Sequence, residues 1–410
     1  MTKFLATGSL MLSLLISLVP AQLDQLQVRL VIPGATLVTL NGTSDPARAL
    51  PGRLLATANN RLFFTLISDA TNTDIYEVYS ITPRDFVKVT DTPTLREKVD
   101  ALNGSDPAPA GMTVQALDVD SDGHLLILTD GPNSGASPER AYLFRVDLRT
   151  KSVALISGLD GLSGVSSLEG STAMAVWETT AYITLNDFFG SITGDSIVTI
   201  DVHAPDGGKT PATLLTSASQ LMAAVGGSPD AIALNDIAVR SATQTLVVLN
   251  SGSRDATDDI LEVIPMTGQV SVLVAATDIE ADLEIPDVGF SGIDVGPRDL
   301  IYLANAFGTP GYLATRAIIA LADAAGGRAT ASVYASEREI LSVPSIRDMA
   351  GNTLRQLGFV NGGLGVHPIT GEVFFTETDV RDPAAHTNGI IGVQRVTGME
   401  PPPPPYRSRR

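Results

Sequence analysis

One short phrase recurs along the chain: a small apolar run ending in valine, a tight turn, and a second apolar run ending in polar residues. When the copies are aligned on the valine, five of them follow one another at intervals of 56 to 71 residues. The five runs are QALDV to Val119, TAMAV to Val176, NDIAV to Val239, SGIDV to Val295 and GGLGV to Val366. A weaker sixth copy, LLATANNRLFFTLIS, covers Leu54 to Ser68. A repeat of this length built from strands is typical of β-propeller blades.

The segments that follow each copy are also strand-like. A third apolar run follows a polar loop, as in AYLFRVDL, and a fourth usually comes next, as in SVALISG. Apolar, β-branched segments bounded by Gly, Pro, Asp and Asn indicate strands and turns. We therefore predict an all-β protein in which residues 22–398 form a single six-bladed β-propeller.

The last copy is incomplete, and this predicts how the ring closes. After Val396 only TGMEPPPPPYRSRR remains, and a proline run cannot form a ladder strand. The N-terminal part carries two unassigned apolar runs, QVRLVI from Gln27 and ATLVTL from Ala35. We expect an N-terminal strand to complete the sixth blade, because an open ring would leave a sheet edge unpaired. Residues 399–410 are predicted to be a disordered, proline-rich basic tail.

The N-terminus indicates export. Lys3 precedes the apolar run Leu10–Val19, and Val19-Pro20-Ala21 offers small residues for cleavage, so residues 1–21 are predicted to be a signal peptide. The run is short for a membrane span of roughly 20 residues, and we expect no span in the mature chain. The predicted location is therefore outside the cell or in a periplasm. With no cysteine, the fold cannot depend on disulfides.

Charge restricts the class of partner. The net charge is −18, from 27 basic and 45 acidic residues. Such a surface repels nucleic acid and favours cations or basic partners. We expect a monomer that binds a small molecule or an extracellular protein, and no nucleic acid.

Alternation along the innermost strands separates bulky residues from small or acidic ones. Bulky residues such as Leu117 and Val119 are expected to pack between blades. The other set, which includes Asp118, Asp236 and Asp294, is expected to face a narrow axial channel. Converging carboxylates repel one another unless they are protonated, hydrated or bound to a cation. An all-oxygen set suits Ca²⁺, and a channel filled with water is the alternative.

Three other sequence features bear on a binding site. The run DVDSDG at 118–123 matches the start of a calcium loop, but its twelfth position is Thr129 rather than a bidentate Glu. His386, in the loop RDPAAHTNG, is expected at the face where the inner strands begin, and a solvated loop histidine is the simpler interpretation. Exposed aromatic residues in loops on that face are candidates for a ligand or partner site. They are Phe188, Phe189, Phe307 and Tyr312.

The phrases LNDIAV, VNGGLGVHP and ALDVDSDGHLLILTD resemble the blade openings of six-bladed propellers of the gluconolactonase and SMP-30 kind, and more loosely of NHL-repeat proteins. The resemblance implies a divalent cation held by Asn, Asp and Glu at the starts of inner strands. It assigns such roles to Asn235 and Asn361, with Glu169 as the glutamate.

Two functions follow as hypotheses. The first is an extracellular binding or scaffold protein, with Ca²⁺ as the candidate ion in its channel. The second, implied by the resemblance, is a metal-dependent lactonase or related ester hydrolase. No catalytic residue is assigned, because the sequence places no base beside a nucleophile.

Overall fold

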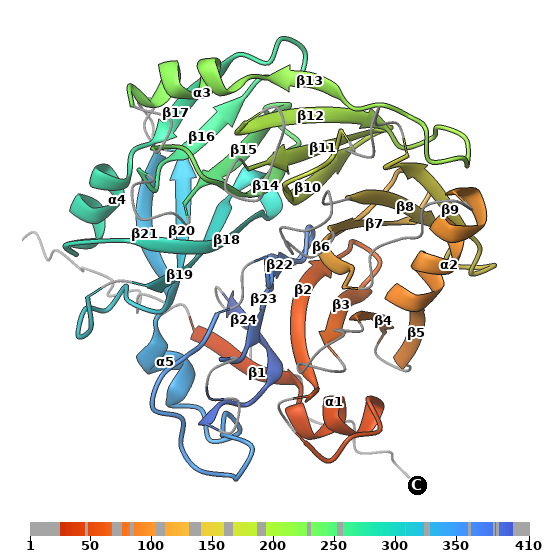
Figure 1. The fold of residues 1–410 in the computed structure, drawn as a ribbon. Helices are drawn as coiled ribbons and strands as arrows, with labels where there is room; N and C mark the ends of the chain where they lie inside the picture. The colour runs from red at the N-terminus through yellow and green to blue at the C-terminus, as the bar shows by residue number, and fades with distance from the viewer. Residues whose placement is uncertain are drawn as a thin grey trace, which may run out of the picture.

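The computed structural model describes residues 25–396, apart from 46–47, 68–75, 83–85, 104–110, 131–140, 160–166, 187–193, 228–230, 252–256, 308, 324–328, 360–361, 380–381 and 383–384. Within these ranges the strands form six antiparallel sheets of four strands each. The sheets lie around a common centre, as Figure 1 shows. The prediction of an all-β, six-bladed propeller is confirmed.

Five blades use four consecutive strands, ordered from the axis outwards. The first contains β2 (Leu50–Ala56), β3 (Leu62–Ile67), β4 (Tyr76–Ile81) and β5 (Phe86–Asp91). The second contains β6 (Thr113–Val119), β7 (Leu125–Asp130), β8 (Tyr142–Val146) and β9 (Val153–Ser157). The third contains β10 (Ser171–Trp177), β11 (Thr180–Leu185), β12 (Ser196–Asp201) and β13 (Thr213–Thr216).

The fourth contains β14 (Leu234–Arg240), β15 (Thr245–Asn250), β16 (Ile260–Val263) and β17 (Val270–Val274). The fifth contains β18 (Gly289–Val295), β19 (Ile301–Phe307), β20 (Ala317–Asp323) and β21 (Ala329–Ala335). Neighbouring inner strands contact each other around the whole ring, from β2 through β22 and back to β2.

The sixth blade joins the two ends of the chain. Its sheet order is β1 (Gln25–Ile32), β24 (Gly389–Val396), β23 (Val373–Glu377) and β22 (Leu364–Val366). Strand β1 runs antiparallel to β24, with Val28 opposite Val393 and Gln25 opposite Val396. This confirms closure by an N-terminal strand. The second apolar run forms the short helix α1 (Gly34–Leu40) instead of a strand.

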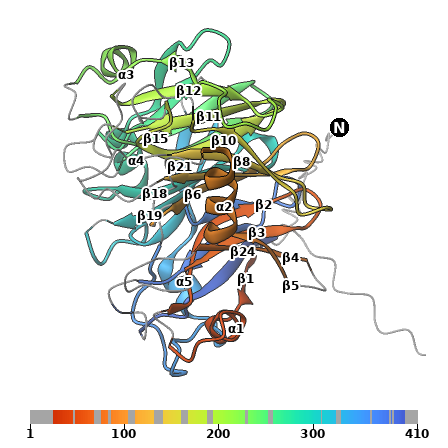
Figure 2. The ribbon, with the colours of Figure 1, turned by 45° about the vertical axis from the view of Figure 1, so that its right-hand side comes forward.

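In the described ranges, four further α-helices, which the repeat pattern does not indicate, lie on the outside of the ring. They are α2 (Thr92–Asn103), α3 (Ala218–Val225), α4 (Ala276–Leu283) and α5 (Glu337–Leu341). Helices α2, α3 and α4 each follow the outermost strand of one blade and contact the outermost strand of the next. Figure 2 shows α2 on the outer side of the strands, away from the axis. None of the helices in the described ranges has the length and apolarity needed to cross a bilayer.

The core is divided into clusters that lie between adjacent blades. Leu117 packs with Phe63 and Val78 of the first blade, whereas its neighbour Ala116 packs with Met174 and Ile183 of the third. The two faces of an inner strand therefore meet the preceding and the following blade. The bulky residues pack between blades as expected. The small and acidic residues face the next blade at the rim of the channel, and do not point straight at the axis.

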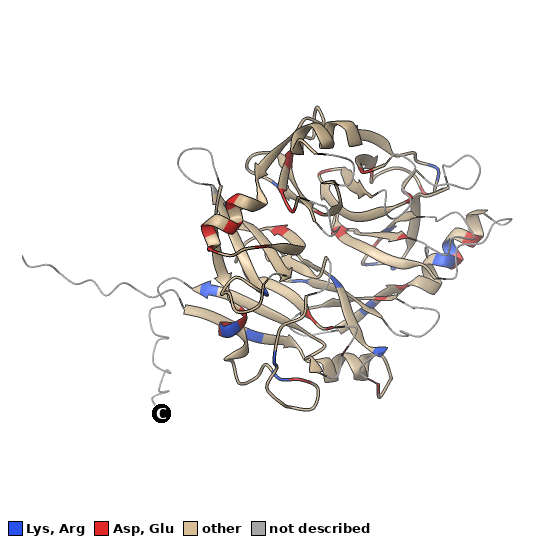
Figure 3. Cartoon of the chain, turned by 60° about the vertical axis from the view of Figure 1, so that its left-hand side comes forward, with Lys and Arg blue, Asp and Glu red and all other residues tan. Residues whose placement is uncertain are grey.

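Acidic residues are spread over the blades and helices (Figure 3). Helix α4 alone carries Asp278, Glu280 and Asp282.

Candidate functional site

A cavity of about 370 Å³ lies where the six inner strands meet. Every blade contributes to its wall, so it occupies the axis of the ring. Its charged and polar lining residues include Arg53, Gln115, Asp118, Asp236 and Asp294. The three aspartates expected at the channel thus share one cavity.

Each of these aspartates joins two inner strands through backbone hydrogen bonds. The Asp118 carboxylate accepts the N–H of Val119 at 2.7 Å and the N–H of Val176, in the next blade, at 2.6 Å. In the same way Asp294 accepts from Val295 at 2.7 Å and from Val366 of the sixth blade at 2.6 Å. An inner strand has no partner on its axial edge, and these carboxylates satisfy N–H groups there.

Asp236 repeats this arrangement nearer the start of its strand. Its carboxylate accepts from Ile237 at 2.9 Å and from Ile293 of the fifth blade at 3.0 Å. As the sequence alignment predicts, Asp118 and Asp294 share a depth, one residue before the aligned valine, and Asp236 is two residues further back. Since the second and fifth blades are three positions apart in a ring of six, Asp118 and Asp294 lie on opposite sides of the cavity.

Burial changes the acidity of all three groups. Desolvation raises the pKa of Asp118 and of Asp294 to about 7, although the backbone donors act in the opposite direction. The pKa of Asp236 rises to about 6, again through desolvation, while the positive charge of Arg53 holds it lower than burial alone would. The cavity therefore contains carboxyl groups that change charge near neutral pH.

Arg53 is the cavity residue that sequence reasoning missed. It lies in β2, and its guanidinium donates to the Gln115 side chain at 2.9 Å. Desolvation lowers the pKa of Arg53, and Asp236 partly offsets this. A Cβ at Gly362 would lie only 2.0 Å from Arg53 Nη1, so a glycine is needed there. The signal in the sequence was weak because the first blade is the least regular copy of the repeat.

Two of the three residues assigned by the family resemblance, Asn235 and Glu169, lie in the described part of the chain. Asn361 lies outside the described residues. Asn235 occupies the irregular position between Leu234 and Asp236 in β14, where its buried amide nitrogen has no hydrogen-bond partner among the described residues. Glu169 is buried in the turn before β10 and is not among the residues that line the cavity.

The residues that line the axial cavity fit a divalent cation poorly. Asp118 and Asp294 lie on opposite sides of the cavity, and Asp236 lies two residues further back along its strand, so the three carboxylates are not gathered at one point. Among the described residues, no three His, Cys, Asp or Glu side chains are arranged to hold a metal ion. The lactonase hypothesis depends on Asn361, which lies outside the described residues.

Of the loop aromatics, Phe307 and Tyr312 are 65% and 45% exposed, as a surface site would require. Phe188 and Phe189 lie outside the described residues.

The expectation of a solvated histidine at position 386 is wrong. His386 is only 2% exposed, and its Nδ1 lies 2.5 Å from the fully buried Glu377 carboxylate. That carboxylate also accepts the Thr387 N–H at 2.7 Å. Desolvation lowers the pKa of His386, but the hydrogen bond and charge of Glu377, with the charges of Asp379 and Asp382, together raise it. The pair is a buried structural element beneath its loop, and so His386 is not a surface ligand.

The DVDSDG run is a turn and does not form a calcium loop. Asp120 Oδ1 accepts the N–H of Asp122 at 3.0 Å and the N–H of His124 at 2.8 Å, which closes the turn between β6 and β7. Thr129, at the twelfth position, is buried within β7.

Comparison with known proteins leaves the family open. No family model matches the sequence, and no curated protein matches it. The fold is similar to regucalcin, a calcium-binding protein from Agrobacterium tumefaciens strain C58, with a TM-score of 0.47 and 13% identity over 85% of this chain and 92% of that one. It is also similar to an α-L-arabinofuranosidase from Fusarium graminearum in complex with an iminosugar inhibitor, with a TM-score of 0.49 and 10% identity over 87% and 95% of the two chains. An α-L-arabinanase from Penicillium chrysogenum gives a TM-score of 0.46 and 10% identity over 85% and 93%. Similarity at this level says nothing about ligand or activity.

Proposed function

We propose that the protein is an exported, monomeric binding protein whose axial cavity takes a small organic cation, such as a protonated amine. The observation that carries this proposal is the set of three carboxylates, Asp118, Asp236 and Asp294, which share one cavity with Arg53, the one cationic side chain among the described residues that line it.

Charge balance favours a cation. When all three carboxylates are ionised, the guanidinium leaves two negative charges uncompensated. Desolvation already raises the pKa of each of these aspartates. A bound cation stabilises the ionised form and lowers these pKa values, and this gain in electrostatic energy is available as binding energy.

Size favours an organic cation over a metal ion. The cavity volume of about 370 Å³ lies within the range of pockets for small molecules. Asp118 and Asp294 lie on opposite sides of the ring, and the described side chains form no ready-made metal site. A cation of several heavy atoms can approach both carboxylates, and the apolar lining residues, such as Met174 and Leu364, can contact its carbon skeleton.

Matched pairs of ligands test this function. We expect putrescine to bind the purified protein at pH 8 in isothermal titration calorimetry, whereas 1,4-butanediol, its neutral counterpart of the same length, does not. Asp294→Asn should weaken putrescine binding at least tenfold. Glu97→Gln, which removes an exposed carboxylate on α2, should leave it unchanged.

The outcomes separate the alternatives. Equal binding of putrescine and the diol contradicts the electrostatic proposal. If Ca²⁺ binds and Asp294→Asn weakens that binding, the ligand of the cavity is a metal ion and not an organic cation. Export is tested separately, because a secreted mature chain should begin at Gln22 when its N-terminus is sequenced.

A further inference from the structure

The carboxylates of the axial cavity lie at two levels along the axis of the ring. Asp118 and Asp294 stand one residue before the aligned valines of their strands, and we call their position the strand-end level. Asp236 stands three residues before its valine, at the strand-start level. Because a strand rises by about 3.3 Å per residue, the two levels are separated by roughly 7 Å.

Arg53 brings a positive charge to the strand-start level. Its Nη2 donates to Gln115 Oε1 at 2.9 Å, and its Nη1 would be 2.0 Å from a Cβ at Gly362. Gln115 and Gly362 each stand four residues before the valine of their strand, so the guanidinium lies near the starts of the strands. The first and fourth blades are three positions apart in a ring of six, which places Arg53 across the cavity from Asp236.

The Arg53 guanidinium hydrogen-bonds to a neutral amide rather than to a carboxylate among the described residues. Gln115 is held in place for this contact, because its Nε2 donates to Thr113 Oγ1 at 2.9 Å. Desolvation lowers the pKa of Arg53 and outweighs the opposing charges of Asp236 and Tyr76. A desolvated positive charge without a paired anion is unfavourable, so an anionic group of a ligand would be stabilised here.

The two levels therefore differ in sign. The strand-start level presents one cation and one carboxylate, whereas the strand-end level presents two carboxylates. All three aspartates already accept backbone N–H groups, with one on each carboxylate oxygen, and each oxygen has a second lone pair for a ligand. A complementary ligand carries both charges at one end and a positive charge at the other.

We propose that the ligand of the axial cavity is a basic α-amino acid of the ornithine type. Its carboxylate binds Arg53, and its α-ammonium binds Asp236. Its side-chain ammonium binds between Asp118 and Asp294. This inference rests on the proposed function, because it specifies the organic cation, and it makes Arg53 the residue that selects amino acids over simple diamines.

A series of related ligands isolates each contact. L-Ornithine is putrescine with a carboxylate added, and we expect it to bind the purified protein roughly tenfold more tightly than putrescine in calorimetry at pH 7.5. Ornithine methyl ester, in which the carboxylate charge is removed, should bind no more tightly than putrescine. L-Norvaline has the same carbon skeleton but no side-chain ammonium, and it should bind at least tenfold more weakly than ornithine.

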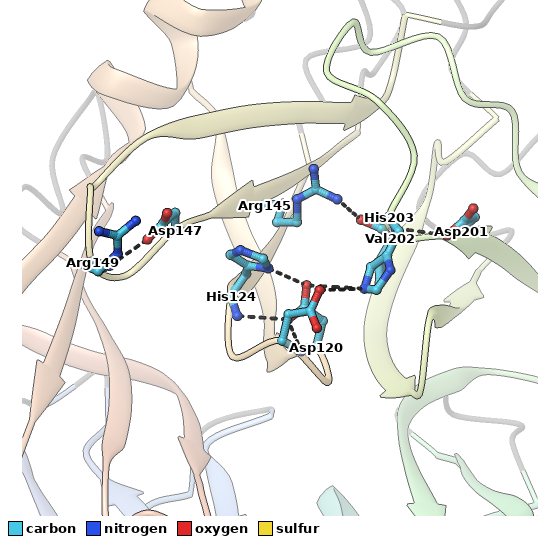
Figure 4. A network of polar contacts seen from close by, with 9 residues as sticks. Asp120, His124, Arg145, Asp147, Arg149, Asp201, Val202 and His203 are labelled. Atoms are coloured by element: carbon cyan, nitrogen blue, oxygen red, sulfur yellow. Dashed lines mark hydrogen bonds and ion pairs between the residues drawn. The ribbon is translucent and has the colours of Figure 1, made fainter.

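Arg53→Gln tests the assigned role of the guanidinium. The variant should bind ornithine and its methyl ester equally, and it should bind putrescine at least as tightly as the parent, because a like charge has been removed. Arg149→Gln is the matched control and should keep the preference for ornithine. Arg149 is exposed in the turn between β8 and β9, where its backbone N–H is donated to Asp147 (Figure 4).

The outcomes separate this inference from the proposed function. If putrescine binds and ornithine binds no more tightly, or if Arg53→Gln keeps the preference for ornithine, the amino-acid ligand is wrong and the cation site stands. If neither ornithine nor putrescine binds, both proposals fail. If Arg53→Gln proves unfolded by circular dichroism, the parent chain decides, and equal affinities for ornithine and its methyl ester contradict the role of Arg53.

Discussion

The Asp294 carboxylate of the fifth blade accepts the backbone N–H of Val366 in the sixth at 2.6 Å. This bond joins the last blade, which the chain assembles from its two ends, to its neighbour. We predict that Asp294→Ala lowers the free energy of unfolding by about 1–3 kcal/mol, because it leaves N–H groups on the axial edge without an acceptor. Urea denaturation measures the loss, and Glu97→Gln is the control. Unchanged hydrogen-exchange protection of the Val366 amide would contradict the role assigned to Asp294.

Stability should fall as pH rises from about 5 to 8. The pKa values of Asp118 and Asp294, about 7, and of Asp236, about 6, exceed the ordinary aspartate pKa of about 3.9. Between these limits the folded protein keeps protons that the unfolded chain has released, so raising the pH favours unfolding. The raised pKa of His386 acts in the same direction. The lowered pKa values of Asp91 and Glu339 contribute stability that is lost only in more acidic solution.

Melting temperatures between pH 4.5 and 8.5, without ligand, check this dependence. Asp294→Asn removes one of the titrating groups and should flatten the curve above pH 5. A melting temperature that rises steadily up to pH 8 in the parent chain would show that the cavity carboxyls have ordinary pKa values.

Gly362→Ala should displace Arg53. The φ angle of Gly362 is 62°, and an added Cβ would lie 2.0 Å from Arg53 Nη1. We expect a loss of about 1 kcal/mol or more from the backbone conformation alone. We also expect altered binding in the cavity.

Gly371→Ala is the matched control. Its φ angle is 68°, but the nearest atom to an added Cβ is at 3.4 Å. Both variants should lose stability in urea, and only Gly362→Ala should change putrescine affinity. If Gly362→Ala and Gly371→Ala change putrescine affinity equally, Arg53 does not contribute to binding in the cavity.

The N-terminal strand should be essential for a closed ring. A chain beginning at Pro33 lacks β1 and exposes the edge of β24, which contains Ile391 and Val393. Exposed apolar edges pair with other chains, so we expect this variant to associate on size-exclusion chromatography. A chain that begins at Gln22 retains β1 and should stay monomeric. A monomeric, equally stable chain from Pro33 would contradict closure by β1.

The sequence was sufficient for the architecture because each blade repeats the same local pattern. It placed Asp118, Asp236 and Asp294 at one axis, since alignment of the inner strands fixes their depth. It could not show that each carboxylate reaches the backbone of the next blade, because that contact depends on how the blades are rotated relative to one another. Arg53 was missed, and His386 was wrongly expected to be solvated, for a related reason: their surroundings come from other blades or from loops without a repeat.

Calorimetry of putrescine binding near pH 7 in two buffers of different ionisation enthalpy tests the cavity most directly. The pKa values of Asp118 and Asp294, about 7, lie near that pH, so a cation that binds between them should release protons. We predict binding heats that differ between the buffers by an amount corresponding to proton release, and a smaller difference for Asp294→Asn. Identical heats in both buffers, or no binding of any organic cation, would show that these carboxylates only hold the blades together.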